Sequence, residues 1–128
     1  MKPRLAALLL VALPASLPAA LPVHACVIPD QGNAPLHRMV SRVKYLHETE
    51  AWRSSLPDGA IASYLLSVDA PLNVSGRCYW PVEARAAGAR WNLFYVSADG
   101  KYVLVARDGG ARPATLVEWR RVSARPVP

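Results

Sequence analysis

Apolar residues recur at helical spacing just after residue 34. They stand three or four positions apart, so they share one face of a helix. These residues are Leu36, Met39, Val40, Val43 and Leu46. Asn33 is a suitable N-cap, with Pro35 in the first helical turn. Residues 49–52 either continue this helix or start a second short turn, and residues 56–59 end it.

From residue 60 onward the pattern changes to short runs rich in aromatic and β-branched residues, separated by turns that contain glycine. Short strands joined by short turns are typical of an antiparallel meander. We expect strands at residues 61–68, 77–85, 90–97, 101–107 and 115–122. Residues 26–34 are expected to form a loop, and residues 123–128 a frayed tail.

The alternation of side chains predicts how these strands pair. A four-residue turn at 86–89 brings Arg85 opposite Arg90 and Val82 opposite Leu93. If Gly100 is left-handed in a three-residue loop, Tyr95 faces Val103 and Leu93 faces Val105. The continuous apolar face that results is expected to receive the helix. Its residues on two of the strands are Trp80, Val82, Trp91, Leu93 and Tyr95.

The predicted fold class is therefore α+β, with one N-terminal helix packed on a four- to five-stranded antiparallel meander sheet. Residues 35–122 form a single domain, because a chain of 128 residues leaves no room for a second core. The order of elements resembles cystatin-like or PepSY-like small domains. The resemblance is one of architecture, without a family-specific motif.

The first 25 residues have the composition of a leader. Lys2 and Arg4 precede the apolar run 5–21, and Ala25 is a small residue directly before Cys26. A basic start, an apolar stretch and a small-residue cleavage site indicate a secretory signal peptide. Pro14 and Pro18 interrupt the run and Pro22 follows it, and its strongest part is too short to span about 30 Å of hydrocarbon. The style of the leader predicts a bacterial protein exported to the periplasm or cell envelope.

The net charge changes little when this leader is removed. The whole chain carries +6, and the loss of Lys2 and Arg4 leaves +4. A mild basic excess favours a protein partner or an anionic envelope component and does not call for nucleic acid.

Cys26 and Cys78 are the only cysteines, and two fates are open to the first of them. In an oxidising compartment they form one disulfide, closing a loop of about 53 residues worth roughly 4 kcal/mol. The alternative is a lipid thioether, because Val23-His24-Ala25-Cys26 resembles a bacterial lipobox except at the bulky His24. Lipidation would attach the protein to a membrane through Cys26 and leave Cys78 unpaired.

Motifs for catalysis or metal binding are weak. His37 and His47 stand ten residues apart, about 15 Å along a straight helix, too far to share a metal ion. No nucleophile elbow or phosphate-binding glycine loop occurs. Carboxylate pairs that could act as acid and base are Glu48 with Glu50 and Glu83 with Glu118. We expect no catalytic residue, metal or cofactor, and a small hydrolase is the weakest alternative.

The face of the sheet opposite the helix is the best candidate for a partner surface, because it mixes apolar and polar groups. Its predicted members are Tyr79, Glu83, Asn92, Phe94, Tyr102 and Leu104. Arg85 and Arg90, directly opposed at a hairpin, either splay into water or clamp a carboxylate or phosphate of a partner.

The binding residues predicted from this surface are Arg85, Arg90, Asn92, Phe94 and Tyr102. The function we expect is that of a small non-catalytic exported protein that binds another macromolecule, as an inhibitor or immunity-type module. The alternative is a lipid-anchored envelope lipoprotein with a structural or assembly role. The pattern specifies neither the partner nor the oligomeric state.

Overall fold

The computed structural model describes residues 26–27 and 34–123. The expected leader and most of the expected loop and tail lie outside these residues. The elements, in chain order, are α1 (Ala34–Lys44), α2 (His47–Ser54), β1 (Ala62–Leu66), β2 (Leu72–Val74), β3 (Arg77–Ala86), β4 (Ala89–Val96), β5 (Val103–Val105), the 3-10 turn η1 (Asp108–Gly110), β6 (Ala114–Thr115) and α3 (Leu116–Ser123).

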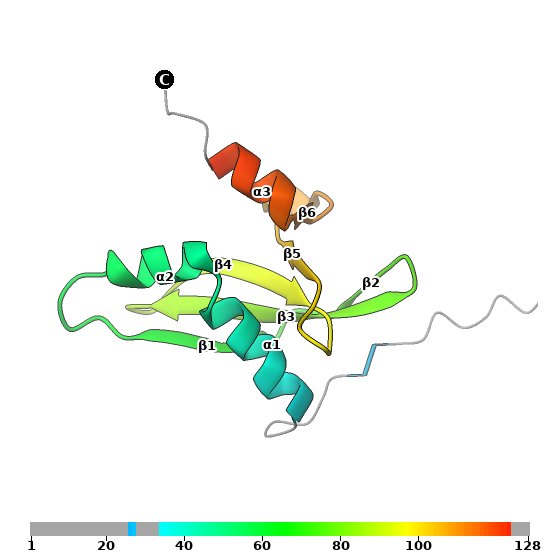
Figure 1. Cartoon of the computed structure of the whole chain (residues 1–128), viewed down its shortest axis with the longest axis horizontal. Helices are drawn as coiled ribbons and strands as arrows, with labels where there is room; N and C mark the ends of the chain where they lie inside the picture. Colours follow the sequence, from blue (N-terminus) through cyan, green and yellow to red (C-terminus); the bar gives the residue numbers. More distant parts are fainter. Residues whose placement is uncertain (1–25, 28–33, 124–128) are drawn as a thin grey trace, which may run out of the picture.

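The strands form one antiparallel sheet in the order β1-β3-β4-β5-β6, and β2 pairs with the first part of β3 (Figure 1). The predicted α+β class and antiparallel meander are confirmed. The described residues hold three helices and six strands, against the expected one helix and four or five strands. The sequence pattern does not indicate β2, a strand of three residues.

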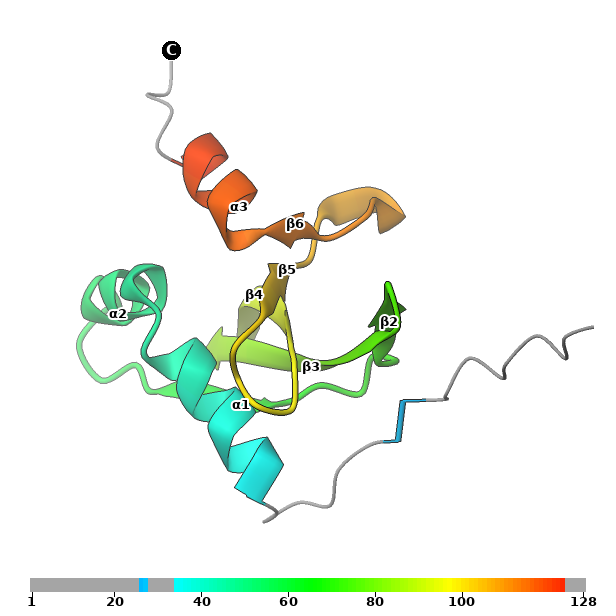
Figure 2. The same cartoon turned by 45° about the vertical axis from the view of Figure 1, so that its right-hand side comes forward.

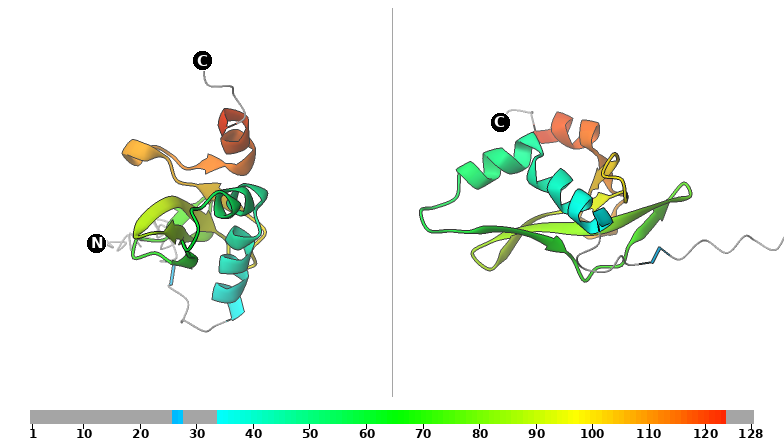
Figure 3. Two further views of the ribbon diagram at one scale, coloured as in Figure 1. Left: turned by 90° about the vertical axis from the view of Figure 1, so that its left-hand side faces the viewer. Right: turned by 60° about the horizontal axis from the view of Figure 1, so that its bottom comes forward.

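All three helices lie on the same side of the sheet (Figure 3). The apolar stripe of α1 packs against the middle strands, as predicted. The buried core consists of Met39, Val43, Leu46, Val82, Ala84, Phe94, Val96, Val103 and Val105. This packing buries one face of the sheet, and within residues 34–123 the other face carries no helix.

A β-bulge in β4 overturns the predicted assignment of side chains to faces. Arg85 lies opposite Arg90, as expected, but Val82 pairs with Phe94 rather than with Leu93. The register shifts next to the Arg85–Arg90 pair, and Trp91 is the extra residue on β4. A shift by one residue turns every later side chain to the other face.

The shift changes which residues of β4 form the core. Phe94 lies in the core, whereas Leu93 and Tyr95 lie on the helix-free face. Trp91 stays on the helix side because it is the bulged residue, and it packs against the core. On the next strand, Tyr95 is opposite Leu104 rather than Val103, because the loop between β4 and β5 is one residue longer than expected.

The turn between β4 and β5 brings Gly100 against α1. Gly100 is left-handed, with φ of 76°, as predicted. A Cβ at this position would lie 3.4 Å from the backbone oxygen of Arg38, so a side chain would crowd the helix as well as strain the turn. The loop is one residue longer than expected, because the Ser97 N–H donates to the Tyr102 carbonyl.

The last predicted strand, residues 115–122, is instead the helix α3. The backbone N–H of Glu118 donates to Thr115 Oγ1, and the N–H of Thr115 donates to Glu118 Oε1. This reciprocal pair is a capping box, which satisfies two free N–H groups at a helix start. Trp119 then packs on Phe94, with 5.7 Å between ring centroids, and Arg120 pairs with Glu48 of α2.

A disulfide joins Cys26 to Cys78, with 5.6 Å between the Cα atoms, which confirms the predicted bridge. The Nε1 of Trp80 also donates to the carbonyl of Val27 at 2.9 Å. Residues 26–27 are therefore held to β3 at two points, the disulfide and this hydrogen bond. In this state the Cys26 sulfur is not available for a lipid thioether. None of the helices in the described part of the chain could cross a lipid bilayer.

Candidate functional site on the helix-free face of the sheet

The helix-free face carries a polar cluster at the end of the β3–β4 hairpin. Glu83 is 5% exposed, and both of its oxygens accept hydrogen bonds from arginines. Arg85 donates to Oε1 at 3.0 Å, and Arg90 donates to Oε2 through Nε at 2.9 Å and through a terminal nitrogen at 2.6 Å. Arg90 shares this face with Glu83 because it pairs with Arg85, which stands two residues after Glu83 on β3.

A second carboxylate completes the cluster. Asp69 accepts a hydrogen bond from Arg90 at 2.8 Å and another from the hydroxyl of Ser67. Arg85 also donates to the carbonyl of Gly88 at 3.1 Å. Two guanidiniums and two carboxylates therefore face one another, and their formal charges cancel.

The pKa values in this cluster show that it is ionised. Burial raises the pKa of Glu83, but the hydrogen bonds and charges of Arg90 and Arg85 outweigh it, and the pKa lies below its ordinary value. The hydrogen bond from Ser67, followed by that from Arg90, lowers the pKa of Asp69. Arg85 and Arg90 thus already bind a carboxylate within the protein, and their predicted role toward a partner stays a prediction.

Beside the cluster lies a cleft of about 290 Å³. Leu72 of β2 and Tyr95 of β4 form one side, and the connection between β5 and β6 forms the other. Figure 2 shows this connection, drawn in orange, next to β2. The residues of this connection that line the cleft include Arg107, Arg112 and Pro113.

A smaller hollow of about 110 Å³ continues from the cleft. It shares Arg112 and Pro113 with the cleft and is otherwise lined by Val74, Leu104 and Thr115. The two hollows together cross β2, β4, β5 and β6 on the helix-free face. We call this surface the arginine cleft; it is lined by Leu72, Val74, Tyr95, Leu104, Arg107, Arg112, Pro113 and Thr115.

The arginine cleft has more positive than negative charge along its wall. Arg107 pairs with Glu118 at 2.9 Å, and Arg112 approaches the same carboxylate only to 4.0 Å. The side chain of Arg112 is 78% exposed, so its guanidinium remains mostly in solvent. Burial, followed by the charge of Asp69, raises the pKa of Tyr95, which keeps its hydroxyl protonated at neutral pH. The cleft therefore offers guanidinium and hydroxyl donors beside an apolar floor.

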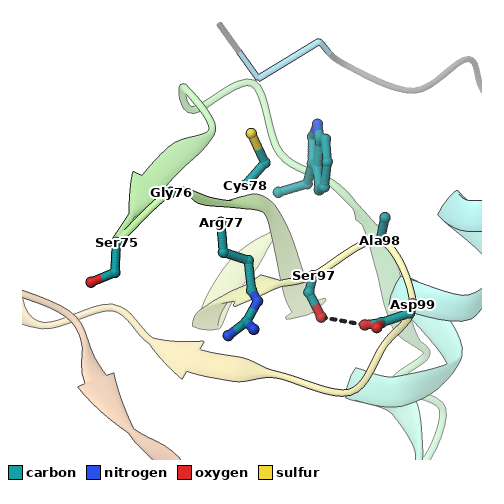
Figure 4. Close-up of a pocket in the computed structure, with 8 residues that line it drawn as sticks. Ser75, Gly76, Arg77, Cys78, Ser97, Ala98 and Asp99 are labelled. Carbon is teal, nitrogen blue, oxygen red and sulfur yellow. Dashed lines mark hydrogen bonds between the residues drawn. The ribbon is translucent and has the colours of Figure 1, made fainter. Parts of the chain in front are cut away.

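A third hollow, of about 480 Å³, lies between the β2–β3 turn and the β4–β5 turn (Figure 4). Its lining includes Arg77, Cys78, Ser97 and Asp99. The Asp99 carboxylate accepts the Ser97 hydroxyl at 2.7 Å, and the Arg77 guanidinium stacks 3.6 Å from the ring centroid of Tyr102. These polar groups are paired with one another. This hollow therefore offers a ligand fewer free hydrogen-bonding groups than the arginine cleft does.

The structure separates the five predicted binding residues. Arg85 and Arg90 lie together on Glu83, and Tyr102 lies toward the other end of the same face, under Arg77. The predicted placement of Phe94 on this face is wrong, because its side chain is 0% exposed in the core. Asn92 pairs with Ala84 on the helix side, so its predicted placement is wrong as well.

Two residues that carry the chemistry of the cleft, Tyr95 and Arg112, were not predicted as site residues from the sequence. Tyr95 reaches this face only through the bulge. Arg107 and Arg112 belong to an irregular connection whose path the pattern does not give. The alternation signal does place Leu104 here, as predicted.

Three of the carboxylates suggested for acid–base pairs, Glu48, Glu83 and Glu118, have lowered pKa values and are held in their ionised form. A hydrogen bond from Arg120 lowers the pKa of Glu48, and bonds from Thr115 lower that of Glu118. A general acid needs the opposite shift. Within the described ranges, no group of three or more His, Cys, Asp or Glu residues is placed to hold a metal ion.

Comparison with known proteins adds no relative. No family model, no curated protein and no solved structure matches the chain. The resemblance to cystatin-like or PepSY-like domains therefore remains one of element order.

Proposed function

We propose that this protein is a non-catalytic, exported binding protein of the bacterial cell envelope, an inhibitor or immunity-type module. Its arginine cleft takes an acidic segment of another protein. The observation that carries the proposal is the cleft itself, where Tyr95 and Leu72 lie beside the exposed guanidinium of Arg112.

The chemistry of the cleft favours a carboxylate-bearing polypeptide. Arginine binds carboxylates through two parallel hydrogen bonds, and Glu118 engages Arg112 only at 4.0 Å. Arginine and tyrosine are enriched at protein interfaces, where an apolar body is buried and a polar tip finds a partner. The cleft combines both with an apolar floor at Leu72 and Leu104.

Two further observations support export and a binding role. The Cys26–Cys78 bridge is compatible with an oxidising compartment, and the leader pattern of residues 1–25 agrees with it. The lowered pKa values of Glu48, Glu83 and Glu118 disfavour acid–base catalysis at these residues.

Site-specific photocrosslinking tests the proposal. A benzophenone amino acid replaces Tyr95, and the protein is irradiated in the envelope fraction of its own cells. The same amino acid replaces Val117 as the control, since Val117 is 63% exposed on α3. We expect a discrete adduct from position 95 and none from position 117.

A charge reversal completes the test. Arg112→Glu is expected to abolish the adduct. The control Arg121→Glu reverses the charge of an exposed arginine on α3, away from the cleft, and is expected to leave the adduct in place. Raising the salt concentration is expected to weaken capture, because exposed ion pairs are screened. Equal adducts from positions 95 and 117, or an adduct insensitive to Arg112→Glu, would contradict a partner in the cleft.

A further inference from the structure

The outer edge of the sheet at β1 lies apart from the arginine cleft and is formed by different residues. Within the described residues, β1 pairs with β3 on one side and has no strand on its other side (Figure 1). Edge strands are normally protected by charged residues, proline or a covering element. The segment 59–68 contains neither a charged residue nor proline.

The hydrogen-bond direction along β1 follows from one contact. The N–H of Ser67 donates to the carbonyl of Pro81 at 2.8 Å, so Ser67 turns its backbone toward β3. In an antiparallel pair this direction alternates along the strand. Ser63 and Leu65 therefore also bond toward β3, whereas Tyr64 and Leu66 point their N–H and C=O groups out of the sheet.

The side chains of the same two residues line a groove. Tyr64 and Leu66 pair with Ala84 and Val82, so they share the helix-side face of the sheet. Together with Leu36 and Val40 of α1, they line a groove of about 340 Å³. Free backbone groups and an apolar groove thus run side by side along β1.

We propose that this edge binds an extended segment of a partner protein, which adds to the sheet as an antiparallel strand beside β1. Its backbone pairs with Tyr64 and Leu66. Because paired residues share a face, every second side chain of the segment enters the groove against Leu36 and Val40. Strand addition of this kind gives affinity through the backbone and specificity through alternate side chains.

The charges around the groove define the occupant further. The α1 helix carries no acidic residue, and of its three cations Arg38 and Arg42 lie on the side of the β4–β5 turn, which leaves Lys44 for the groove. Lys44 follows Val40 by one helical turn and so lies on the same face. At the other wall, Arg53 donates to the hydroxyl of Tyr64 at 3.1 Å. The occupant is therefore a segment with apolar residues at alternate positions and acidic residues at its ends.

These charges disfavour a second copy of the chain as the occupant. A two-fold pairing of β1 with itself places both α1 helices on the same side of a continuous sheet. The faces of the two α1 helices that carry Lys44 would then be turned toward each other, without a compensating carboxylate on α1. A foreign acidic segment meets no such repulsion.

A synthetic peptide tests the inference. It alternates valine and threonine over five residues, has a glutamate at each end, and is added to the full mature protein. Amide hydrogen exchange followed by NMR reports each backbone group. In the free protein, the amides of Tyr64 and Leu66 are expected to exchange fast and those of Ser63 and Leu65 slowly. The peptide is expected to slow the exchange of Tyr64 and Leu66.

Two changes in the peptide provide matched controls that need no protein variant. Methylating the backbone nitrogens of its inward-pointing residues keeps the side chains but removes the strand pairing. This is expected to weaken binding at least about tenfold, since two hydrogen bonds are lost. Exchanging the terminal glutamates for lysines is also expected to weaken it. In the protein, Lys44→Glu removes the preference for glutamate ends, whereas Lys101→Glu in the β4–β5 turn retains it.

Three results would overturn the inference. The first is a peptide that leaves Tyr64 and Leu66 unprotected, and the second is binding that survives backbone methylation. The third is slow exchange of both amides in the free protein, whether the cover is a second copy, detected by sedimentation, or the chain's own residues. None of these outcomes affects the arginine cleft on the other face.

Discussion

The indole rings of Trp52 and Trp91 are stacked, with centroids 4.7 Å apart and planes within 5° of parallel. Trp52 comes from α2 and Trp91 is the bulged residue of β4, so the stack joins the helix layer to the irregular point of the sheet. Trp119 of α3 meets Trp91 edge-on at 6.3 Å. One ring thus contacts both short helices, neither of which is long enough to be stable alone.

Trp91→Ala is expected to lower the free energy of unfolding by about 2–4 kcal/mol, because it removes the contact surface of α2 and α3. Chemical denaturation measures the change. Trp91→Phe keeps an aromatic ring against Trp52 and is expected to lose less. A loss below about 0.5 kcal/mol in the alanine variant would show that the stack does not hold the helices.

The same bulge explains how far the sequence could predict the face of each side chain. The expected strand 77–85 and the pairing of Arg85 with Arg90 agree with the structure, because both depend on local turn chemistry. The expected placement of Phe94 is wrong. The prediction assumes that the side chains of β4 alternate strictly between the two faces, and the extra residue at the bulge breaks this alternation before Phe94. A bulge depends on tertiary packing, here of Trp91, which the local pattern does not reveal.

The candidate site was predictable only in part for the same reason. The pattern places Glu83 and Leu104 on the helix-free face. The predicted Arg85–Arg90 pairing already brings Arg90 to the face of Glu83, but the pattern turns Tyr95 to the other face, because it does not show the bulge. The positions of Arg107 and Arg112 depend on an irregular connection that packs across the sheet.

The helix α3, by contrast, had a readable signal. Thr115 and Glu118 stand at capping-box spacing, but the short run 115–122 also fits a strand, and the two patterns compete. Thr115→Ala is expected to lower the free energy of unfolding by about 1 kcal/mol, because the cap is lost. Thr115→Ser keeps the oxygen and serves as the control. Equal stability of the alanine and serine variants would argue against the cap.

Glu83 should make stability depend on pH. Its pKa is lowered in the folded state, so its contribution is complete above the ordinary carboxyl range, near pH 4, and is lost as the pH falls through the folded value. Glu83→Gln is expected to cost about 1–3 kcal/mol at pH 7, because charge-assisted bonds to Arg85 and Arg90 are weakened. Unfolding curves should show this difference shrinking toward pH 3. A difference between Glu83→Gln and the wild type that stays constant with pH would contradict the ionised cluster.

Thr49 carries a buried polar atom that finds no partner. Its side chain is 0% exposed, and Oγ1 makes no hydrogen bond within the described part of the chain. Thr49→Val replaces the hydroxyl by a methyl group of similar shape and is expected to raise the free energy of unfolding by about 1 kcal/mol. Thr49→Ser keeps the hydroxyl, loses the methyl group and should destabilise. A destabilised valine variant would mean that the hydroxyl is hydrogen-bonded in solution.

The disulfide between Cys26 and Cys78 leads to two separate predictions, one for the mass of the protein and one for its stability. Intact mature protein should weigh two hydrogens less than its reduced form, and it should carry no lipid on Cys26. Replacing both cysteines by serine frees a loop of about 53 residues and is expected to lower the free energy of unfolding by roughly 4 kcal/mol. Reducing the wild-type protein should reproduce that loss while leaving the double variant unchanged. A lipid mass on Cys26, or equal stability with and without reductant, would return Cys26 to the lipoprotein alternative and leave Cys78 as a free thiol.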